Sequence, residues 1–297
     1  MPANRLIHYR PPVASPAGLL NALTFDVEDW YQGIEIGPER WCEFERRLER
    51  GLSTILDSLD AANCRATFFV LGQCALDHPE LIAQIAQRGH ELGTHGQTHT
   101  KVYDLPLGQF EEELIQSIEA IEQASGVRVQ SHRAPYFSVT QASYKALGVM
   151  RRNGILIDAS IYPGRNYRYG IPGTPASPYR IDEFDLIEFP VSVIDALGRK
   201  LGLGGAYFRI LPYPVTRRGI ARLNAAGQPA SFYAHPWEFD PFHPRVRFRR
   251  TAQATHYFNL ISTPARLRQL LQDFRFGTMS RVLTDLELLA PTAPVAA

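Results

Sequence analysis

Residues 66–100, ATFFVLGQCALDHPELIAQIAQRGHELGTHGQTHT, contain the pattern that decides the fold. The continuous apolar run from Ala66 to Leu71 ends at Gly72 and is typical of a strand that is covered on both faces. His78-Pro79-Glu80 then begins a helix that ends at Arg88-Gly89. The apolar side of this helix consists of Leu81, Ile82, Ile85 and Ala86. A second extended run follows, so the stretch indicates a parallel α/β arrangement.

The same alternation continues on both sides of this stretch. Further strands are predicted at Asn21–Phe25, Gly154–Ser160 and Leu186–Ile194, and further helices at Trp41–Asn63, Leu107–Ser125 and Ala265–Phe274. The glycine- and proline-rich segments Ile171–Pro178 and Gly202–Phe208 are interpreted as loops. The sheet is either open or closed into a barrel, and in both cases catalytic groups sit at the C-terminal ends of the strands.

Two histidines, His95 and His99, lie four residues apart just after the second extended run. One helical turn there would place both imidazoles on one face, where they could bind one metal ion. The alternative is a pair of surface or capping histidines, but the small neighbours Gly93, Thr94 and Gly96 favour close approach to a ligand. A zinc site needs a third protein ligand, often a carboxylate.

Three carboxylates, Asp26, Glu28 and Asp29, follow the first predicted strand. Alternation along an extended chain places Asp26 and Glu28 on one face and turns Asp29 away. Asp26 and Glu28 are therefore the first candidates for the missing ligand, and an exposed acidic turn is the alternative. Because both clusters lie at strand ends, they can meet in space although they are far apart in the sequence.

Three more polar residues occupy predicted strand ends. Arg133 precedes Ala-Pro-Tyr136, Asp158 ends the strand Gly154–Ser160, and His235 precedes Pro236 and Trp237. Taken alone, Arg133 reads as a solvated arginine in a turn and His235 as a hydrogen-bonded structural histidine.

The composition excludes several classes of protein. Lys and Arg number 31 against 30 Asp and Glu, which argues against nucleic acid as a partner. The cysteines Cys42, Cys64 and Cys74 have no CxxC spacing, so neither a disulfide framework nor a cysteine-rich zinc site is expected. No run approaches the roughly 18 apolar residues of a membrane span, and the N-terminus lacks a signal-peptide core. We therefore expect a cytoplasmic protein with one domain over residues 20–285, between tails at 1–19 and 286–297.

The strand ends, taken in order, resemble the motifs of the NodB-type polysaccharide deacetylases, the fourth family of carbohydrate esterases. Asp26-Val-Glu28 resembles the first motif, His95-Gly-Gln-Thr-His99 the second, Arg133-Ala-Pro-Tyr136 the third, Asp158 the fourth and His235 the fifth. The second acid of the first motif is displaced, and the fifth motif reads His-Pro-Trp. The segments NALTFDVEDW, HRAPYFS and FYAHPWEFDP resemble the subgroup found beside PEP-CTERM exopolysaccharide loci.

The resemblance implies a distorted (β/α) barrel of about seven strands, the NodB homology fold, with a family-specific part at about 200–285. It also implies a hydrolase that removes acetyl groups, in the main hypothesis N-acetyl groups, with a divalent metal. The metal would be Zn²⁺, with Co²⁺ as the alternative. The substrate would be an exopolysaccharide or its precursor, either an acetylated polysaccharide or a lipid-linked oligosaccharide.

The resemblance further implies a role for each motif residue. Glu28, with Asp29 as the alternative, would hold the metal together with His95 and His99. Asp26 would be the general base and Arg133 would orient it. His235 would be the general acid with Asp158 as its partner. The backbone near Tyr136 would stabilise the oxyanion, and Trp237 would contact the sugar.

Two rival functions are compatible with the same residues. One is an amidohydrolase of this scaffold that acts on a cyclic amide or a peptidoglycan sugar. The other is an inactive carbohydrate-binding protein, which would have no use for an acid and a base beside one metal. The sequence does not determine the oligomeric state.

Overall fold

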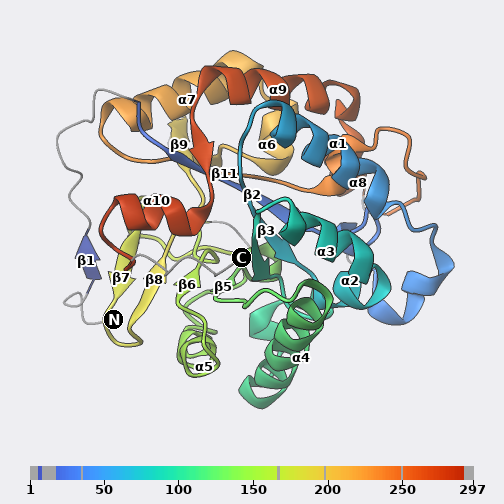
Figure 1. Ribbon diagram of the computed structural model, residues 1–297, viewed down its shortest axis with the longest axis horizontal. Helices are drawn as coiled ribbons and strands as arrows, with labels where there is room; N and C mark the ends of the chain where they lie inside the picture. The colour runs from blue at the N-terminus through green and yellow to red at the C-terminus, as the bar shows by residue number, and fades with distance from the viewer. Residues whose placement is uncertain are drawn as a thin grey trace.

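The computed structural model describes residues 6–8, 18–34, 36–165, 168–196, 199–248 and 250–290. One curled sheet with the order β1-β7-β8-β6-β5-β4-β3-β2-β11 lies at its centre (Figure 1). Its strands are β1 Leu6–His8, β2 Asn21–Val27, β3 Thr67–Val70, β4 Glu91–Thr94, β5 Ser131–His132, β6 Ile157–Asp158, β7 Tyr179–Ile181, β8 Leu186–Glu188 and β11 Ser231–Ala234. From β11 to β8 the neighbours pair in parallel, whereas β7 and β1 are antiparallel at one edge.

The sheet does not close into a complete barrel in the described part of the chain, because β1 and β11 remain at opposite ends of its path. The short strand β12, Phe276–Gly277, adds a parallel pairing to β2. Seven strands therefore run parallel along the main path, which confirms the predicted α/β fold with about seven strands in a distorted barrel. In the described residues this barrel is open. Because these strands are parallel, their carboxyl ends lie along one edge of the sheet.

The central strands are buried on both faces, as their apolar sequence predicts. Every residue of β2 and of β3 is buried, and the rings of Phe25 and Phe68 stack with centroids 5.1 Å apart. Full burial of such a side chain contributes about 1.5–3 kcal/mol. The metal-site candidates therefore follow strands that the core holds firmly.

Helices cover the outside of the sheet. Figure 1 shows α1 to α5 following one another around it, with α7 and α9 together on another side. The helices are α1 Leu48–Ala61, α2 Gly72–Asp77, α3 Pro79–Gln87, α4 Leu107–Ser125, α5 Ala146–Arg152, α6 Gly205–Ile210, α7 Tyr213–Ala225, α8 Arg250–Tyr257, α9 Thr263–Asp273 and α10 Met279–Asp285. Short 3-10 helices include η2 Pro38–Glu43, η4 Pro135–Phe137 and η5 Pro236–Phe239. Of the described helices, none has the length and apolarity needed to cross a bilayer.

The predicted helix Trp41–Asn63 begins later than expected. The segment Pro38–Glu43 forms η2, and α1 starts only at Leu48. Asp29 explains this start, because its Oδ2 accepts hydrogen bonds from the backbone N–H groups of Arg47 at 2.7 Å and Leu48 at 3.1 Å. A carboxylate from a distant loop thus caps a helix that has no cap of its own.

Other boundaries also differ from the sequence prediction. The strand predicted at Leu186–Ile194 splits into β8 and β9, Val193–Ala196, because Pro190 cannot donate to a ladder. Strand β9 pairs instead with β10, Arg199–Gly202, in a separate hairpin. The predicted loop Gly202–Phe208 contains the start of α6.

The chain ends also depart in part from the predicted tails. Within 1–19, residues Leu6–His8 form β1, which pairs with β7. Residues 291–297 of the predicted C-terminal tail lie outside the described residues. The single domain over residues 20–285 stays a prediction.

Helix α1 packs directly against η5 through Gly51. A Cβ atom at Gly51 would lie 1.9 Å from the carbonyl oxygen of Pro236. Gly51→Ala should therefore lower the free energy of unfolding by about 1–3 kcal/mol or more, as overpacking does, although alanine favours a helix by about 1 kcal/mol.

The matched control is Gly108→Ala in α4, where an added Cβ would meet nothing within 4 Å. This change should leave stability unchanged or raise it by up to about 1 kcal/mol. Urea unfolding of both variants measures the difference. Equal stabilities would contradict the close packing of α1 on η5.

Candidate metal centre and adjoining cleft

Three side chains at the carboxyl edge of the sheet converge on one point. Glu28 follows β2, and His95 and His99 follow β4. One ligand atom from each lies within 4.8 Å of the other two, and all three side chains are buried. Two imidazoles and one carboxylate are a donor set that suits zinc and leaves a coordination position open.

The contact between Glu28 and His99 also fits a bound cation. Glu28 Oε2 lies 2.6 Å from His99 Nε2, yet this buried oxygen has no hydrogen bond of normal geometry among the described residues. Burial alone would raise the pKa of Glu28, but His99, with His235 and His95, outweighs burial and lowers it. Glu28 is therefore a buried, charged candidate ligand, and a divalent ion would satisfy its unpaired oxygen.

The two histidines meet through a loop and not through the helical turn that their spacing suggested. After β4 the chain bends, with φ of 78° at Gly96 and 58° at His99. A left-handed conformation at a non-glycine residue is strained and is found most often at functional sites. The two imidazole centroids are 5.1 Å apart. The loop therefore achieves the convergence that we had expected from a helix.

The tautomer of His95 is set by its backbone partner. His95 Nδ1 lies 2.7 Å from the carbonyl oxygen of Arg133, which only accepts hydrogen bonds. Nδ1 must therefore carry the proton, and Nε2 keeps its lone pair for a metal. Burial lowers the pKa of His95 to about 4, so the ring is neutral near pH 7.

Of the two alternative carboxylates, the structure places Glu28 in the centre and Asp29 outside it. Asp29 accepts hydrogen bonds from the backbone of Trp30, Arg47 and Leu48. Burial raises its pKa to about 6. Asp26 and Glu28 share one face and Asp29 points away, as strand alternation predicted.

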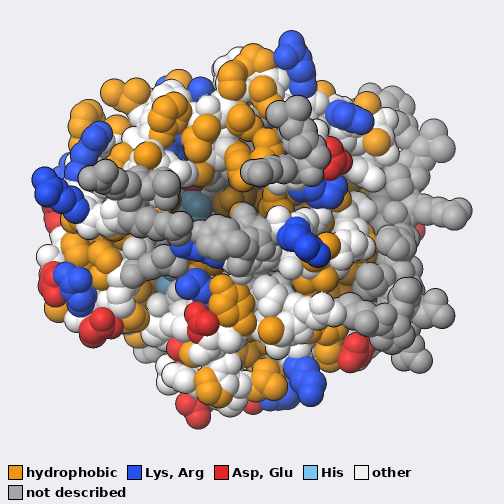
Figure 2. All heavy atoms as spheres, turned by 180° about the vertical axis from the view of Figure 1, so that it is seen from behind, with side chains coloured by type: hydrophobic (Ala, Val, Ile, Leu, Met, Phe, Trp, Pro, Cys, Tyr) orange, Lys and Arg blue, Asp and Glu red, His pale blue; other side chains and the backbone are white. Residues whose placement is uncertain are grey.

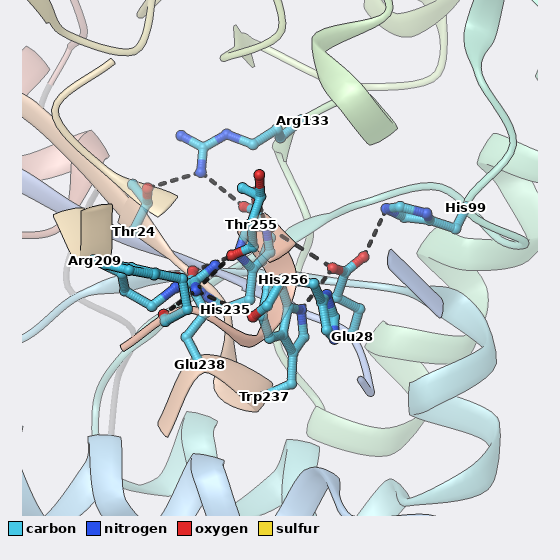
Figure 3. A network of polar contacts seen from close by, with 12 residues as sticks. Thr24, Glu28, His99, Arg133, Arg209, His235, Trp237, Glu238, Thr255 and His256 are labelled. Atoms are coloured by element: carbon cyan, nitrogen blue, oxygen red, sulfur yellow. Dashed lines mark hydrogen bonds and ion pairs between the residues drawn. The ribbon is translucent and has the colours of Figure 1, made fainter. Parts of the chain in front are cut away.

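Asp26 lies beside the metal ligands in a separate buried pair. Arg133, which is fully buried, donates from Nη1 to Asp26 Oδ1 at 2.7 Å and to Thr24 Oγ1 at 2.8 Å (Figure 3). The other oxygen, Asp26 Oδ2, lies 3.8 Å from His235 Nε2. A buried carboxylate is costly unless it is paired, so the bond to Arg133 offsets the burial of Asp26 and fixes its orientation.

His235 is held by Glu238, a residue that the sequence analysis missed. Glu238 Oε1 accepts from the backbone N–H of His235 at 3.0 Å and from His235 Nδ1 at 2.7 Å. Burial would lower the pKa of His235, but the bond to Glu238 and the charges of Glu28 and Asp26 raise it to about 9. The sequence does contain a signal for this contact. His235 and Glu238 are three residues apart, which is the spacing of a capping box between the N-cap and N3 residues of a helix, here η5.

The predicted pairing of Asp158 with His235 is wrong. Asp158 Oδ1 instead contacts His132 Nδ1 at 2.9 Å and accepts from Ser160 Oγ at 2.5 Å. Ser160 in turn accepts from the backbone N–H of Ala134. Asp158 therefore supports the loop that follows Arg133. It does not pair with His235 because Asp158 ends β6 and His235 follows β11, and strands β2 to β5 lie between these two strands in the sheet.

Two connected hollows lie over these groups. A cleft of about 190 Å³ contains Asp26 and the metal ligands, and it adjoins a larger cleft of about 700 Å³. Figure 2, which shows the face opposite to that of Figure 1, has histidine surface in a hollow. The residues that line both clefts are Gly33, Tyr136, Tyr233, His235 and Trp237. The larger cleft extends along α6 and α8, which the sequence analysis did not connect with the site.

The predicted contact residues Tyr136 and Trp237 are therefore placed at the site. Tyr136 has a left-handed backbone, with φ of 56°, and its ring lies 4.6 Å from that of His99. Trp237 Nε1 donates to Glu28 Oε1 at 3.0 Å. The contacts of both residues with oxyanion or sugar stay predictions.

The hydrogen bond from Trp237 to Glu28 Oε1 should matter for metal binding, because it restrains the Glu28 carboxylate so that Glu28 Oε2 faces His99. Trp237→Phe should weaken zinc binding by about 10- to 100-fold, as the loss of an outer-shell partner does. Trp41→Phe is the control, since Trp41 is also buried but donates to the carbonyl of Ile36. Competition with a chromophoric chelator measures both affinities. An unchanged affinity in Trp237→Phe would show that Glu28 needs no such partner.

Comparison with known families divides the chain into two parts. Residues 21–154 match the family described as polysaccharide deacetylase, and residues 159–284 match a domain of unknown function, DUF3473. The match to the polysaccharide deacetylase family thus covers less than half of the chain. The metal ligands, Asp26 and Arg133 belong to the first part, whereas His235 and Glu238 belong to the second.

Curated relatives match only parts of the chain. The peptidoglycan-N-acetylglucosamine deacetylase of Bacillus cereus is 30% identical over 91 residues, which are 31% of this chain and 33% of that protein. The chitooligosaccharide deacetylase of a Bradyrhizobium species is 34% identical over 112 residues, 37% of this chain and 47% of that protein. The chain thus spans less than half the length of each of these relatives.

A solved structure matches the whole fold. A crystal structure from Mycobacterium smegmatis, provisionally described as a polysaccharide deacetylase, aligns with a TM-score of 0.64 over 98% of this chain and 99% of that chain. The sequence identity is 20%, so the likeness shows the fold alone.

Proposed function

We propose that this chain is a metal-dependent deacetylase that hydrolyses the N-acetyl group of an exopolysaccharide or of its sugar precursor. The observation that carries the proposal is one arrangement: Glu28, His95 and His99 form a metal-ligand set, with Asp26 and His235 both beside it. The polysaccharide deacetylase match over residues 21–154 supports the reaction class.

The donor set favours zinc, with cobalt as the alternative, over magnesium or calcium, which prefer oxygen ligands. When bound, the metal would supply Lewis acidity to the acetyl carbonyl and to the attacking water. The residues of the chain itself perform the proton transfers.

Asp26 is the general base of this proposal. It is a carboxylate outside the ligand set, and Arg133 holds one of its oxygens, so the other is available to accept a proton from water. The water oxygen then bonds to the acetyl carbon. A backbone N–H group in the segment around Tyr136 would stabilise the resulting negative charge.

His235 is the general acid. An amine is a poor leaving group, so as the C–N bond breaks its electron pair must be captured by a proton from His235 Nε2. The products are the free amine of the sugar and acetic acid, which loses its proton to solvent to give acetate. Asp26 has gained one proton and His235 has lost one, and proton exchange with solvent restores both. The raised pKa of His235 keeps this proton available near pH 7.

The two clefts support a saccharide substrate. The smaller cleft is suited to the acetylated group, and the larger cleft has the size and mixed polarity typical of ligand sites. Tyr136, Tyr233 and Phe248 supply aromatic surface for sugar rings in it.

Acetate release from an N-acetylated chito-oligosaccharide tests the proposal. Protein stripped of metal should be inactive, and added zinc or cobalt should restore acetate release. Fragments of acetylated exopolysaccharide and of peptidoglycan, compared by kcat/KM, then identify the substrate class. No acetate from any of these with metal bound, or equal release without metal, would refute the proposal.

A further inference from the structure

One end of the His235 ring and its backbone N–H are held by Glu238, a residue of the second half of the chain. Its Nδ1 donates to Glu238 Oε1, so Nε2 is the nitrogen that faces the site. Nε2 lies 3.8 Å from Asp26 Oδ2 and 3.9 Å from Glu28 Oε1. The orientation of the ring is therefore determined by where Glu238 is placed.

Glu238 is itself held by Arg209 of α6. Arg209 Nε donates to Glu238 Oε2 at 2.5 Å, and both side chains are 1% exposed. Arg209 Nη1 also donates to the backbone oxygens of Thr255, His256 and Phe258, at 2.7–3.1 Å (Figure 3). Both oxygens of Glu238 are thus engaged, and the guanidinium is bonded to three carbonyl groups at the C-terminal end of α8.

A buried ion pair of this kind is weak evidence of a stabilising role, because desolvation offsets most of its attraction. Its geometry has a more specific consequence. The carboxylate can neither rotate nor withdraw from His235 without breaking its hydrogen bond to Arg209 Nε. The family match also ends at residue 154, so Arg209, His235 and Glu238 all belong to the part described as a domain of unknown function.

We propose that Glu238 and Arg209 form a positioning pair for His235, so that the second half of the chain supplies and aligns the proton donor for the first half. This inference rests on the proposed deacetylation. Glu238 replaces Asp158 as the partner of the histidine. Arg209 acts through Glu238 and does not touch the reacting atoms.

The test uses two substrates that differ in their need for a proton donor. The amine of an N-acetylated chito-oligosaccharide must be protonated as it leaves, whereas 4-nitrophenolate leaves 4-nitrophenyl acetate without a proton. Glu238→Gln, which preserves the size of the side chain, should lower kcat on the oligosaccharide by about 10- to 100-fold. Its KM, its bound zinc and its kcat on the ester should each stay within about threefold of the wild type, since binding and nucleophile are untouched.

Arg209→Lys is the second variant and guards against misfolding of the first. Lysine retains a positive charge beside Glu238 but cannot reach all the carbonyl groups that Arg209 contacts. We therefore expect a smaller loss of kcat on the oligosaccharide than in Glu238→Gln, again with kcat on the ester little changed. His235→Ala sets the full size of the general-acid loss on that substrate. Circular dichroism and thermal unfolding establish that each variant is folded.

The outcomes separate the two proposals. Equal losses on oligosaccharide and ester, or no loss on either, in a folded variant with wild-type zinc content would overturn the positioning role alone. A wild type with zinc bound that releases no acetate from the oligosaccharide or from the exopolysaccharide and peptidoglycan fragments would instead overturn the proposed deacetylation on which it rests.

Discussion

Replacing Asp26 by asparagine should lower acetate release from an N-acetylated oligosaccharide by about 10²- to 10⁴-fold, the usual contribution of a general base. Asparagine retains the shape of the side chain and an acceptor for Arg133 Nη1, but it cannot accept a proton from water. Because Asp26 is outside the ligand set, zinc binding should remain close to that of the wild type. Acetate assays and chelator competition on the same sample measure both quantities.

The control for this variant is Asp185→Asn, which makes the same change of charge at an exposed aspartate paired with Arg151 and Arg180. It should leave turnover unchanged. Loss of one charge from the buried pair with Arg133 also costs stability, so thermal unfolding must show that Asp26→Asn is folded at the assay temperature. A folded, zinc-loaded Asp26→Asn protein with wild-type turnover would assign the base to another residue.

His99→Ala should lower the affinity for zinc by more than about 10- to 100-fold, the usual effect of losing an outer-shell contact. The variant leaves one imidazole and one carboxylate, and structural or catalytic zinc sites use at least three protein ligands. Turnover at limiting zinc should fall in parallel. The fold should persist, because His99 lies in a loop outside the strands.

His78→Ala is the matched control, since His78 precedes α3, is partly exposed, lies 3.8 Å from Glu80 and is not a member of the ligand set. It should bind zinc as the wild type does. Competition with a chelator over a series of zinc concentrations distinguishes the two variants. Undiminished zinc binding in His99→Ala would move the metal site elsewhere.

Much of the metal centre could be predicted because it depends on local geometry and on strand direction. The apolar run before Gly72 and the helix after it indicated parallel strands, and parallel strands bring their carboxyl ends to one edge. That rule alone predicts that Asp26, Glu28, His95 and His99 approach one another. The alternation of side chains along β2 also predicted that Glu28 and Asp29 point to opposite faces. The structure agrees, because the Asp29 carboxylate accepts hydrogen bonds from backbone N–H groups at the start of α1.

The partner of His235 could not be predicted in the same way. Asp158 and His235 both follow strands, but the order of strands in a sheet is not written in the chain order. Strands β3, β4 and β5 lie between β2 and β6, while β11 lies on the other side of β2. Asp158 therefore reaches His132, and the nearer Glu238 reaches His235.

The α/β fold, the acidic and histidine clusters and their common edge are predictable because they follow from periodicities of a few residues. Which side chains bond to one another depends on how distant segments pack. The loop after β4 brings His99 to Glu28 through a left-handed residue, and α6, in a segment that its glycines marked as a loop, delivers Arg209 to Glu238. Both contacts depend on long-range packing, which selects one arrangement from many that the local sequence allows.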